Sequence, residues 1–230
     1  MPENNLETIA LDLVARAMNA GATAADAVVR EGEEFSSLLR LGKIETLKEA
    51  ASKALGLRVF VGQRSASSYS SDFSSPSLDR LVSRTLAMAR ATSEDPASGL
   101  PEARSLGKFA GDLKLYSDDL RAISTEDRIA TARRAEEAAL AADPRIKNSE
   151  GASFDASEGA KAYANSLGFT GSYRASYCGV TAIPIAQSDG GMQRDYWYSV
   201  GRGAKDLESP ESVGRKAASR AVRRLGARKV

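Results

Sequence analysis

The 230-residue sequence contains no histidine and only one cysteine, Cys178. Zinc enzymes bind their metal chiefly through imidazole and thiolate side chains, so the usual ligands of a zinc centre are missing. The other candidates are acidic pairs whose adjacent members point in different directions from a helix or strand: Glu33/Glu34, Asp118/Asp119 and Glu136/Glu137. We expect these acids to be solvated, and we predict no metal site, no cofactor and no zinc hydrolysis in this chain.

The lack of histidine also removes the usual base that activates a serine or cysteine nucleophile. Serine is abundant, but no serine–lysine spacing stands out, so a serine–lysine hydrolase is an open alternative without a candidate residue. Cys178 lies between Tyr177 and Gly179 in a strand-like segment, where a packing role is expected. A single cysteine excludes an intrachain disulfide and a Cys-x-x-Cys redox pair. The sequence therefore predicts no catalytic residue.

Net charge and hydropathy exclude further functional classes. The net charge of +2 gives no overall attraction to nucleic acid or membrane. No apolar run approaches the length needed to span a bilayer, and the polar N-terminus lacks the features of a secretory signal. Hydrophobic residues make up 42% of the chain, enough to build a core. We expect a soluble, cytoplasmic protein.

Hydrophobic periodicity predicts four helices, at residues 6–20, 75–91, 125–142 and 209–226. Three of them begin with capping signals: Ser75 before Pro76, Ser124 with Asp127 three residues on, and Ser209 before Pro210. Residues 92–111 hold several prolines and glycines with little periodicity, which predicts a linker. We place the domain boundary there, with domains at residues 1–105 and 106–230.

The remaining apolar and alternating segments predict strands. They lie at residues 27–29, 35–41, 44–48, 55–61 and 66–70, with Gly42-Lys43 at a hairpin tip, and at 146–153, 159–166, 168–186 and 192–200. Residues 55–61 are nearly all apolar, which predicts a central strand covered on both faces. Runs of strands flanked by helices predict an α+β fold of two domains, each an antiparallel or mixed sheet layered with helices.

The last predicted helix is strongly basic, with seven cations in or beyond its later turns: Arg215, Lys216, Arg220, Arg223, Arg224, Arg228 and Lys229. The helix dipole favours cations at this end, and Glu208 and Glu211 lie at the complementary end. We favour a solvated amphipathic helix. The alternative is a free-standing interaction module that contacts nucleic acid through this helix.

An ordered set of segments follows the N-terminal amphipathic helix through the chain. In the first half they are Gly42-Lys43-Ile44-Glu45, Gly56-Leu57-Arg58-Val59-Phe60-Val61-Gly62 and Ser71-Asp72-Phe73-Ser74. In the second half they are Ala135-Glu136-Glu137-Ala138, Ala164-Asn165-Ser166-Leu167-Gly168-Phe169 and Arg223-Arg224-Leu225-Gly226-Ala227-Arg228-Lys229-Val230. Together they resemble the TldD/PmbA family over nearly the whole chain, and its PmbA (TldE) branch in particular.

This resemblance implies a part of a heterodimeric metalloprotease, in which TldD and PmbA subunits pair and trim unfolded or leader-bearing peptides. Family members carry two N-terminal domains before a β-rich C-terminal domain. The zinc motif, His-Glu-x-x-x-His, lies in the C-terminal domain of TldD and is absent from PmbA. The chain would correspond to the two N-terminal domains without the third, whether Val230 is a natural end or a truncation. Zinc is then expected only in the partner TldD subunit.

The resemblance also implies a role for the N-terminal regions, which help build the subunit interface and wall the cleft that holds extended peptide. We predict that Asn165, Ser166, Gly168 and Phe169 line that cleft, with a structural hairpin turn as the other interpretation. The leading hypothesis is a non-catalytic scaffold, dimerisation and peptide-channel module. Its expected partners are a TldD-type subunit or a second copy, and peptides, with no membrane or nucleic acid.

Overall fold

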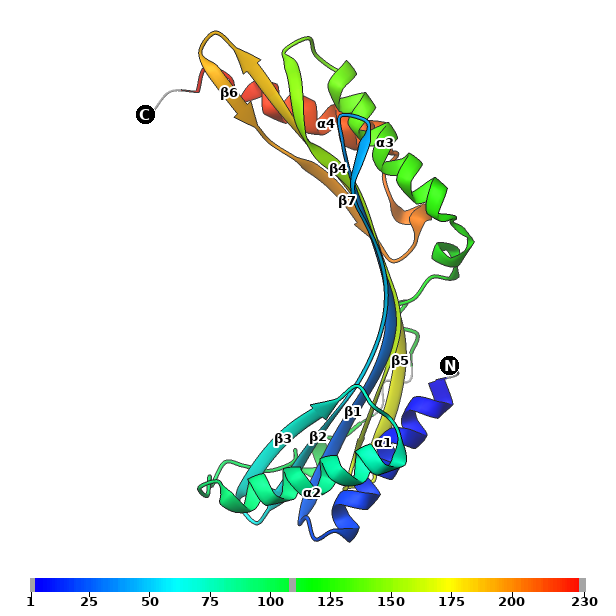
Figure 1. Ribbon diagram of the computed structural model, residues 1–230, viewed down its shortest axis with the longest axis vertical. Coiled ribbons are helices and arrows are strands. Elements are labelled where there is room, and N and C mark those ends of the chain that lie inside the picture. The colour runs from blue at the N-terminus through cyan, green and yellow to red at the C-terminus, as the bar shows by residue number, and fades with distance from the viewer. Residues whose placement is uncertain (1–2, 108–110, 228–230) are drawn as a thin grey trace. The chain divides into compact units, whose positions relative to one another are not determined.

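The computed structural model describes residues 3–107 and 111–227. Within them lie four α-helices, namely α1 (Glu3–Asn19), α2 (Ser75–Ala91), α3 (Thr125–Ala141) and α4 (Pro210–Arg223) (Figure 1). The seven strands are β1 (Ala24–Arg40), β2 (Lys43–Val61), β3 (Arg64–Ser70), β4 (Ile146–Asn165), β5 (Thr170–Ser188), β6 (Gly191–Arg194) and β7 (Trp197–Gly201). Helices therefore flank runs of strands in the predicted order.

Two helices, α3 and α4, begin close to the predicted residues because their capping serines act as expected. The Ser124 hydroxyl accepts a hydrogen bond from the N–H of Asp127 at 3.0 Å. The Ser209 hydroxyl likewise accepts the N–H of Ser212 at 3.2 Å. At α2 the N-cap is Ser74, one residue before the predicted Ser75, and its side chain makes no capping hydrogen bond; Pro76 lies in the first turn, where a missing N–H leaves no intrahelical bond unmade.

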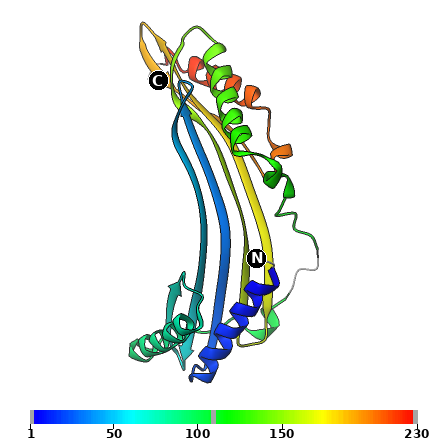
Figure 2. The same cartoon turned by 45° about the vertical axis from the view of Figure 1, so that its right-hand side comes forward.

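All seven strands belong to one sheet, in the order β3-β2-β1-β4-β5-β6, and β7 also pairs with β5. β3 is antiparallel to β2, and β6 and β7 are antiparallel to β5. Figure 2 shows the long strands side by side. β1 and β4, which the sequence assigns to different domains, are neighbours. Helices on an antiparallel sheet confirm the α+β class.

The strands are longer than predicted, because polar residues were interpreted as breaks. β4 runs without interruption through the predicted gap at residues 154–158, and β1 joins two predicted strands. The polar side chains pair across the sheet instead, as where the Ser36 hydroxyl donates to Asp155 at 2.6 Å. At Gly159 a Cβ would lie 2.5 Å from the Glu31 carbonyl oxygen, so this glycine marks a close backbone approach within the sheet.

Residues 55–61 are only partly covered on both faces. Leu55, Leu57 and Val59 on one face are at most 1% exposed; on the other face Phe60 is 2% exposed but the Arg58 side chain is 44% exposed. Helices pack on the face that carries the three apolar residues, so the other face can hold a charged side chain. A long apolar run in the sequence therefore overstated the burial of this strand.

Contacts divide the chain into two compact units, each made of three segments. Unit 1 comprises Met1–Gly32, Ala51–Leu113 and Gly159–Arg174, and unit 2 comprises Glu33–Ala50, Lys114–Glu158 and Ala175–Val230. Four strands, β1, β2, β4 and β5, have residues in both units. The predicted boundary between residues 105 and 106 stays a prediction.

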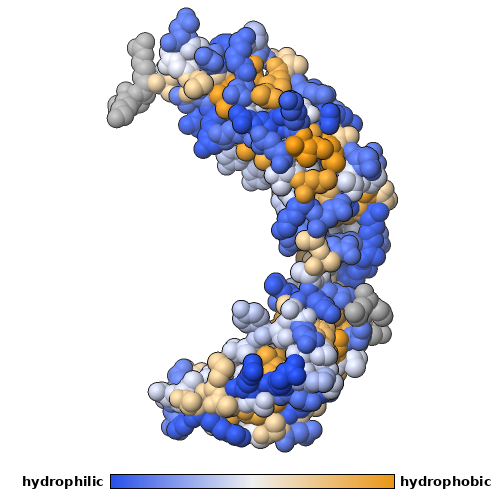
Figure 3. Space-filling view, in the orientation of Figure 1, coloured by the Kyte–Doolittle hydropathy of each residue, from blue (hydrophilic) through white to orange (hydrophobic). Residues whose placement is uncertain are grey.

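Each unit has its own apolar core. In unit 1, α1 and α2 contribute residues such as Leu13 and Leu86, which pack with Val29 and Leu57 of the sheet. In unit 2, helical alanines and Val213 pack with sheet residues such as Phe154. On the face drawn in Figure 3, hydrophilic residues predominate. Among the described helices, none is long and apolar enough to cross a membrane.

Candidate functional site

The four predicted site residues lie at the connection between β4 and β5. Asn165 is the last residue of β4, and residues 166–169 form the turn. The Asn165 side-chain oxygen accepts hydrogen bonds from the N–H groups of Leu167 (3.0 Å) and Phe169 (3.1 Å). Its main-chain N–H donates to the Phe169 carbonyl at 3.0 Å. Gly168 has a φ of +82°, which glycine adopts without strain. Asparagine and glycine therefore close a tight hairpin.

Ser166 and Phe169 hold this turn against β1 and β4 within unit 1. The Ser166 N–H donates to the Ala25 carbonyl at 2.9 Å, and its hydroxyl accepts the Ala25 N–H at 3.1 Å. The Phe169 ring lies against Tyr163, with 5.9 Å between the ring centroids. Leu167, at the tip, is 49% exposed. The structure thus brings all four predicted residues together, with their polar groups largely engaged within the turn.

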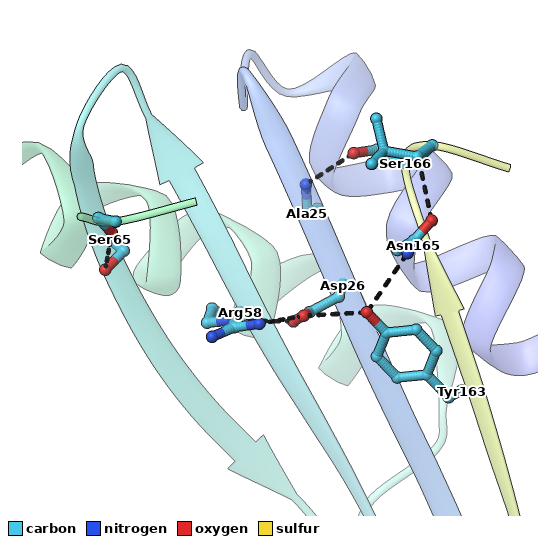
Figure 4. A network of polar contacts seen from close by, with 9 residues as sticks. Ala25, Asp26, Arg58, Ser65, Tyr163, Asn165 and Ser166 are labelled. Atoms are coloured by element: carbon cyan, nitrogen blue, oxygen red, sulfur yellow. Dashed lines mark hydrogen bonds and ion pairs between the residues drawn. The ribbon is translucent and has the colours of Figure 1, made fainter. Parts of the chain in front are cut away.

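A polar network extends from the turn across three strands of unit 1 (Figure 4). The Asn165 amide donates to the Tyr163 hydroxyl at 3.4 Å, and that hydroxyl donates to Asp26 at 3.3 Å. Arg58 donates to Asp26 through its Nε at 3.1 Å and through a second nitrogen. Because Asp26 is only 7% exposed, this pairing keeps a nearly buried carboxylate satisfied. The network therefore fixes the turn to β1 and β2.

Sequence reasoning missed Asp26, Arg58 and Tyr163. The available signal was alternation: Asp26 stands between Ala25 and Ala27 in β1. Arg58 and Tyr163 have the same kind of neighbours in their strands. Because alternate strand residues point to opposite faces, an isolated polar residue in an apolar strand predicts a position on the face without helices.

The protonation states of this network are set by burial and by its ion pair. Burial raises the pKa of Tyr163; the Asn165 hydrogen bond opposes this, and the negative charge of Asp26 adds to it. The hydrogen bond to Asp26 raises the pKa of Arg58, against the effect of burial. The tyrosine thus keeps its proton and the arginine its charge at neutral pH. This arrangement suits a structural clamp better than proton transfer.

Neither the cysteine nor the acids form a reactive cluster among the described residues. Cys178 is fully buried, as expected of a packing thiol, and burial, followed by the charges of Asp119 and Asp206, raises its pKa to about 11. In residues 3–107 and 111–227, no three or more His, Cys, Asp or Glu side chains gather in a way that could hold a metal ion.

One of the acids predicted to be solvated is buried. Glu136 of α3 is 2% exposed, and its two carboxylate oxygens accept the N–H groups of Leu41 and Gly42, each at 2.9 Å. The prediction was wrong because these donors are about 95 residues away in sequence. Its neighbour Glu137 is exposed, as expected.

Two basic residues of α4 and its C-cap Arg224 are engaged with acids of unit 2, whereas Arg215 and Arg223 are exposed without an acidic partner among the described residues. Lys216 pairs with Glu208 at 2.7 Å, and Arg220 and Arg224 both pair with Asp195, at 3.2 and 3.5 Å. Lys216 and Arg220 also lie over the Trp197 ring. These contacts support the amphipathic-helix interpretation over a nucleic-acid surface. Arg228 and Lys229 lie outside the described residues.

Comparisons with known proteins match both halves of the chain to one family. Residues 25–89 match domain 1 and residues 118–225 match the central domain of the PmbA/TldA metallopeptidases. The chain is 37% identical over 206 residues to the metalloprotease PmbA of Escherichia coli O157:H7, covering 90% of this chain and 45% of the relative. It is 36% identical over 214 residues to a PmbA homolog of Haemophilus influenzae, covering 93% and 47%.

Solved structures agree with these matches. A protein of Bacteroides thetaiotaomicron, described as a candidate modulator of DNA gyrase, has a TM-score of 0.91 at 25% identity, over 100% of this chain and 52% of that one. TldE from Thermococcus kodakarensis has a TM-score of 0.80 at 13% identity, over 93% and 47%, which shows a shared fold. This chain spans about half the length of these relatives. With both family domains matched in order, the chain belongs to the PmbA/TldD metallopeptidase family and is of the PmbA (TldE) type.

Proposed function

We propose that this chain is a non-catalytic module of a TldD/PmbA-type metalloprotease, serving subunit association and the holding of extended peptide. The observation that carries the proposal is the match to family domains 1 and 2 in a chain without a single histidine. Zinc and hydrolysis would then come from a TldD-type partner subunit. The peptides would be unfolded or leader-bearing substrates.

The β4–β5 turn is the proposed contribution to the peptide cleft. The Asn165 oxygen and the N–H groups of Leu167 and Phe169 are engaged within the turn, so a peptide would be contacted chiefly by the side chain at its tip, Leu167. A rigid turn suits this role because little conformational entropy is lost when it binds.

Subunit association is tested by co-expressing the chain with its cognate TldD-type subunit and measuring the mass of the complex by light scattering. The expected result is a stable complex, with peptidase activity confined to preparations that contain the TldD-type subunit. The proposal would be overturned if the purified chain cleaved a test peptide and kept that activity after repurification and in the presence of a chelator.

The cleft role is tested by photo-crosslinking within that complex. A photoreactive amino acid replaces Leu167, which is 49% exposed, and in a matched control it replaces Met88 of α2, which is 50% exposed. A bound substrate peptide is expected to crosslink at residue 167 and not at residue 88. Equal crosslinking at both positions would remove the turn from the cleft.

A further inference from the structure

β3 forms one edge of the sheet. Among the described strands it pairs only with β2, in a register that runs from Val61 opposite Arg64 to Leu55 opposite Ser70. A strand with one neighbour leaves half of its main-chain N–H and C=O groups directed away from the sheet. Which residues carry those outward groups follows from the turn that joins the two strands.

The turn between β2 and β3 contains two residues, Gly62 and Gln63, so its flanking residues Val61 and Arg64 form the closing hydrogen-bonded pair. Main-chain direction alternates along a strand, so Ser65, Ser67 and Tyr69 direct their N–H and C=O groups outward. An independent contact agrees: the Thr92 hydroxyl donates to the Ser65 carbonyl at 3.3 Å.

The outward groups of Ser67 and Tyr69 are unpaired. In the part of the chain that the structure describes, no hydrogen bond is made to the main-chain N–H or C=O of either residue beyond the β2 pairing. Ser65 is occupied by Thr92, so the free edge begins after it. It therefore offers two N–H and two C=O groups at the spacing of a partner strand.

The free part of this edge also lacks the charged side chains and prolines that commonly protect against strand addition. Protected edges carry lysines, prolines or bulges, as the exposed residues 43–50 of β2 do with Lys43 and Lys48. β3 has neither lysine nor proline, and its free part is Ser67, Ser68, Tyr69 and Ser70. The Tyr69 side chain is 86% exposed, and its cross-strand partner Gly56 offers no side chain to cover it. The edge thus combines accessible main chain with an uncovered aromatic ring.

We propose that the β3 edge binds an extended polypeptide segment by strand addition, through the main chain of Ser67 and Tyr69, with the Tyr69 ring packing against a side chain of that segment. Main-chain recognition places few demands on peptide sequence. The biological ligand, a peptide substrate of the protease, rests on the proposed function; the binding itself does not.

The length of the free edge favours a peptide over a second copy of the chain. Four residues at about 3.3 Å each span roughly 13 Å, whereas a stable dimer buries about 800 Å² per partner. Pairing along so short an edge would bury far less than that. A short peptide that binds and leaves is the occupant that fits.

The experiment measures binding of a fluorescein-labelled octapeptide, alternating threonine and valine with a lysine at each end, by fluorescence anisotropy with the full chain. Ser67→Pro removes one outward N–H and is tolerated at an edge, so affinity should fall about tenfold. Ser67→Ala keeps that N–H and should bind as the parent chain does. Tyr69→Ala should weaken binding several-fold, and circular dichroism checks that each variant is folded.

A second arm leaves the protein unchanged. The same octapeptide N-methylated at every internal residue has no free N–H group along either edge, so it should bind at least tenfold more weakly. Bound peptide should slow hydrogen exchange at the Ser67 and Tyr69 amides, while Ala66 and Ser68 are already paired with β2. Absence of binding, equal binding of both peptides, or full affinity in Ser67→Pro would overturn the proposal. Failure to associate with a TldD-type subunit would instead count against the proposed function alone.

Discussion

The Asn165 side chain makes three hydrogen bonds, two accepted from main-chain N–H groups of the turn that it begins and one donated to Tyr163. It is only 2% exposed, so water cannot replace these partners without rearrangement. The residue most visible to sequence reasoning as a peptide contact therefore has a clear structural task at the same position.

Replacing Asn165 with alanine is expected to lower the free energy of unfolding by about 1–2 kcal/mol, because the N–H groups of Leu167 and Phe169 lose their acceptor. Urea denaturation monitored by circular dichroism measures the change. Leu167→Ala, at the exposed tip of the same turn, should change stability by no more than about 0.5 kcal/mol. Equal losses in the two variants would show that the side-chain oxygen is dispensable.

Cys178 makes stability depend on alkaline pH. Its pKa is raised from 9.0 to about 11 in the folded chain, chiefly by burial. The unfolded chain therefore releases the thiol proton first, and stability falls as pH rises from about 9 to about 11. Urea denaturation across this range should show a steeper decline for the parent chain than for Cys178→Ala. Buried tyrosines titrate in both proteins, so parallel curves would contradict the assignment to the thiol.

At the scale of elements, the β1–β2 turn is built from an unusual pair of residues. Leu41 and Gly42 have φ values of 49° and 76°, the conformation of a type I′ hairpin turn. Asparagine is favoured at the first of these positions and leucine is not. The predicted tip at Gly42-Lys43 was one residue late because nothing in the sequence marks a leucine for the left-handed region. Glu136 compensates by accepting both N–H groups.

Leu41→Asn is expected to raise the free energy of unfolding by about 0.5–1 kcal/mol, because asparagine adopts a positive φ more readily. Leu41 is 52% exposed, so little apolar burial is lost. Thermal and urea denaturation test this prediction. Leu47→Asn, at an equally exposed strand position with ordinary backbone angles, should give no gain. A loss of stability in Leu41→Asn would mean that the leucine side chain matters more than the backbone.

Elements whose signals are local were predictable from the sequence. The caps at Ser124 and Ser209 lie within one turn of each helix start, and the four helices follow from apolar spacing within each segment. The lengths of β1 and β4 were not predictable, because polar residues such as Ser36 and Asp155 pair only after the strands meet. The same distinction holds for the candidate site. Its turn was predictable from Asn165 and Gly168, which are close in sequence. The Asp26–Arg58 pair was not, because it joins residues that are 32 positions apart.

For the molecule as a whole, charge pairing decides whether the basic helix offers a surface to nucleic acid. Lys216, Arg220 and Arg224 are engaged with acids, which reduces the charge available for phosphates, although Arg215 and Arg223 have no acidic partner among the described residues. We expect binding to a labelled 20-base-pair DNA duplex weaker than about 10⁻⁴ M at physiological salt, outside the range of ordinary non-specific binding. Fluorescence anisotropy over a salt series measures it.

A variant that lacks the acidic partners of these cations serves as a positive control for this prediction. Asp195→Ala with Glu208→Ala frees the three cations and should strengthen DNA binding, with a steeper dependence on salt. Tight binding by the parent chain that weakens steeply with salt would favour the alternative in which α4 contacts nucleic acid.

The Glu136 carboxylate has a consequence for how unit 2 opens. Since it joins α3 to the tip of the β1–β2 hairpin through two N–H groups, the helix cannot undock without releasing both. Hydrogen exchange at the amides of Leu41 and Gly42 therefore reports whether α3 is docked, at single-residue detail and without any added label.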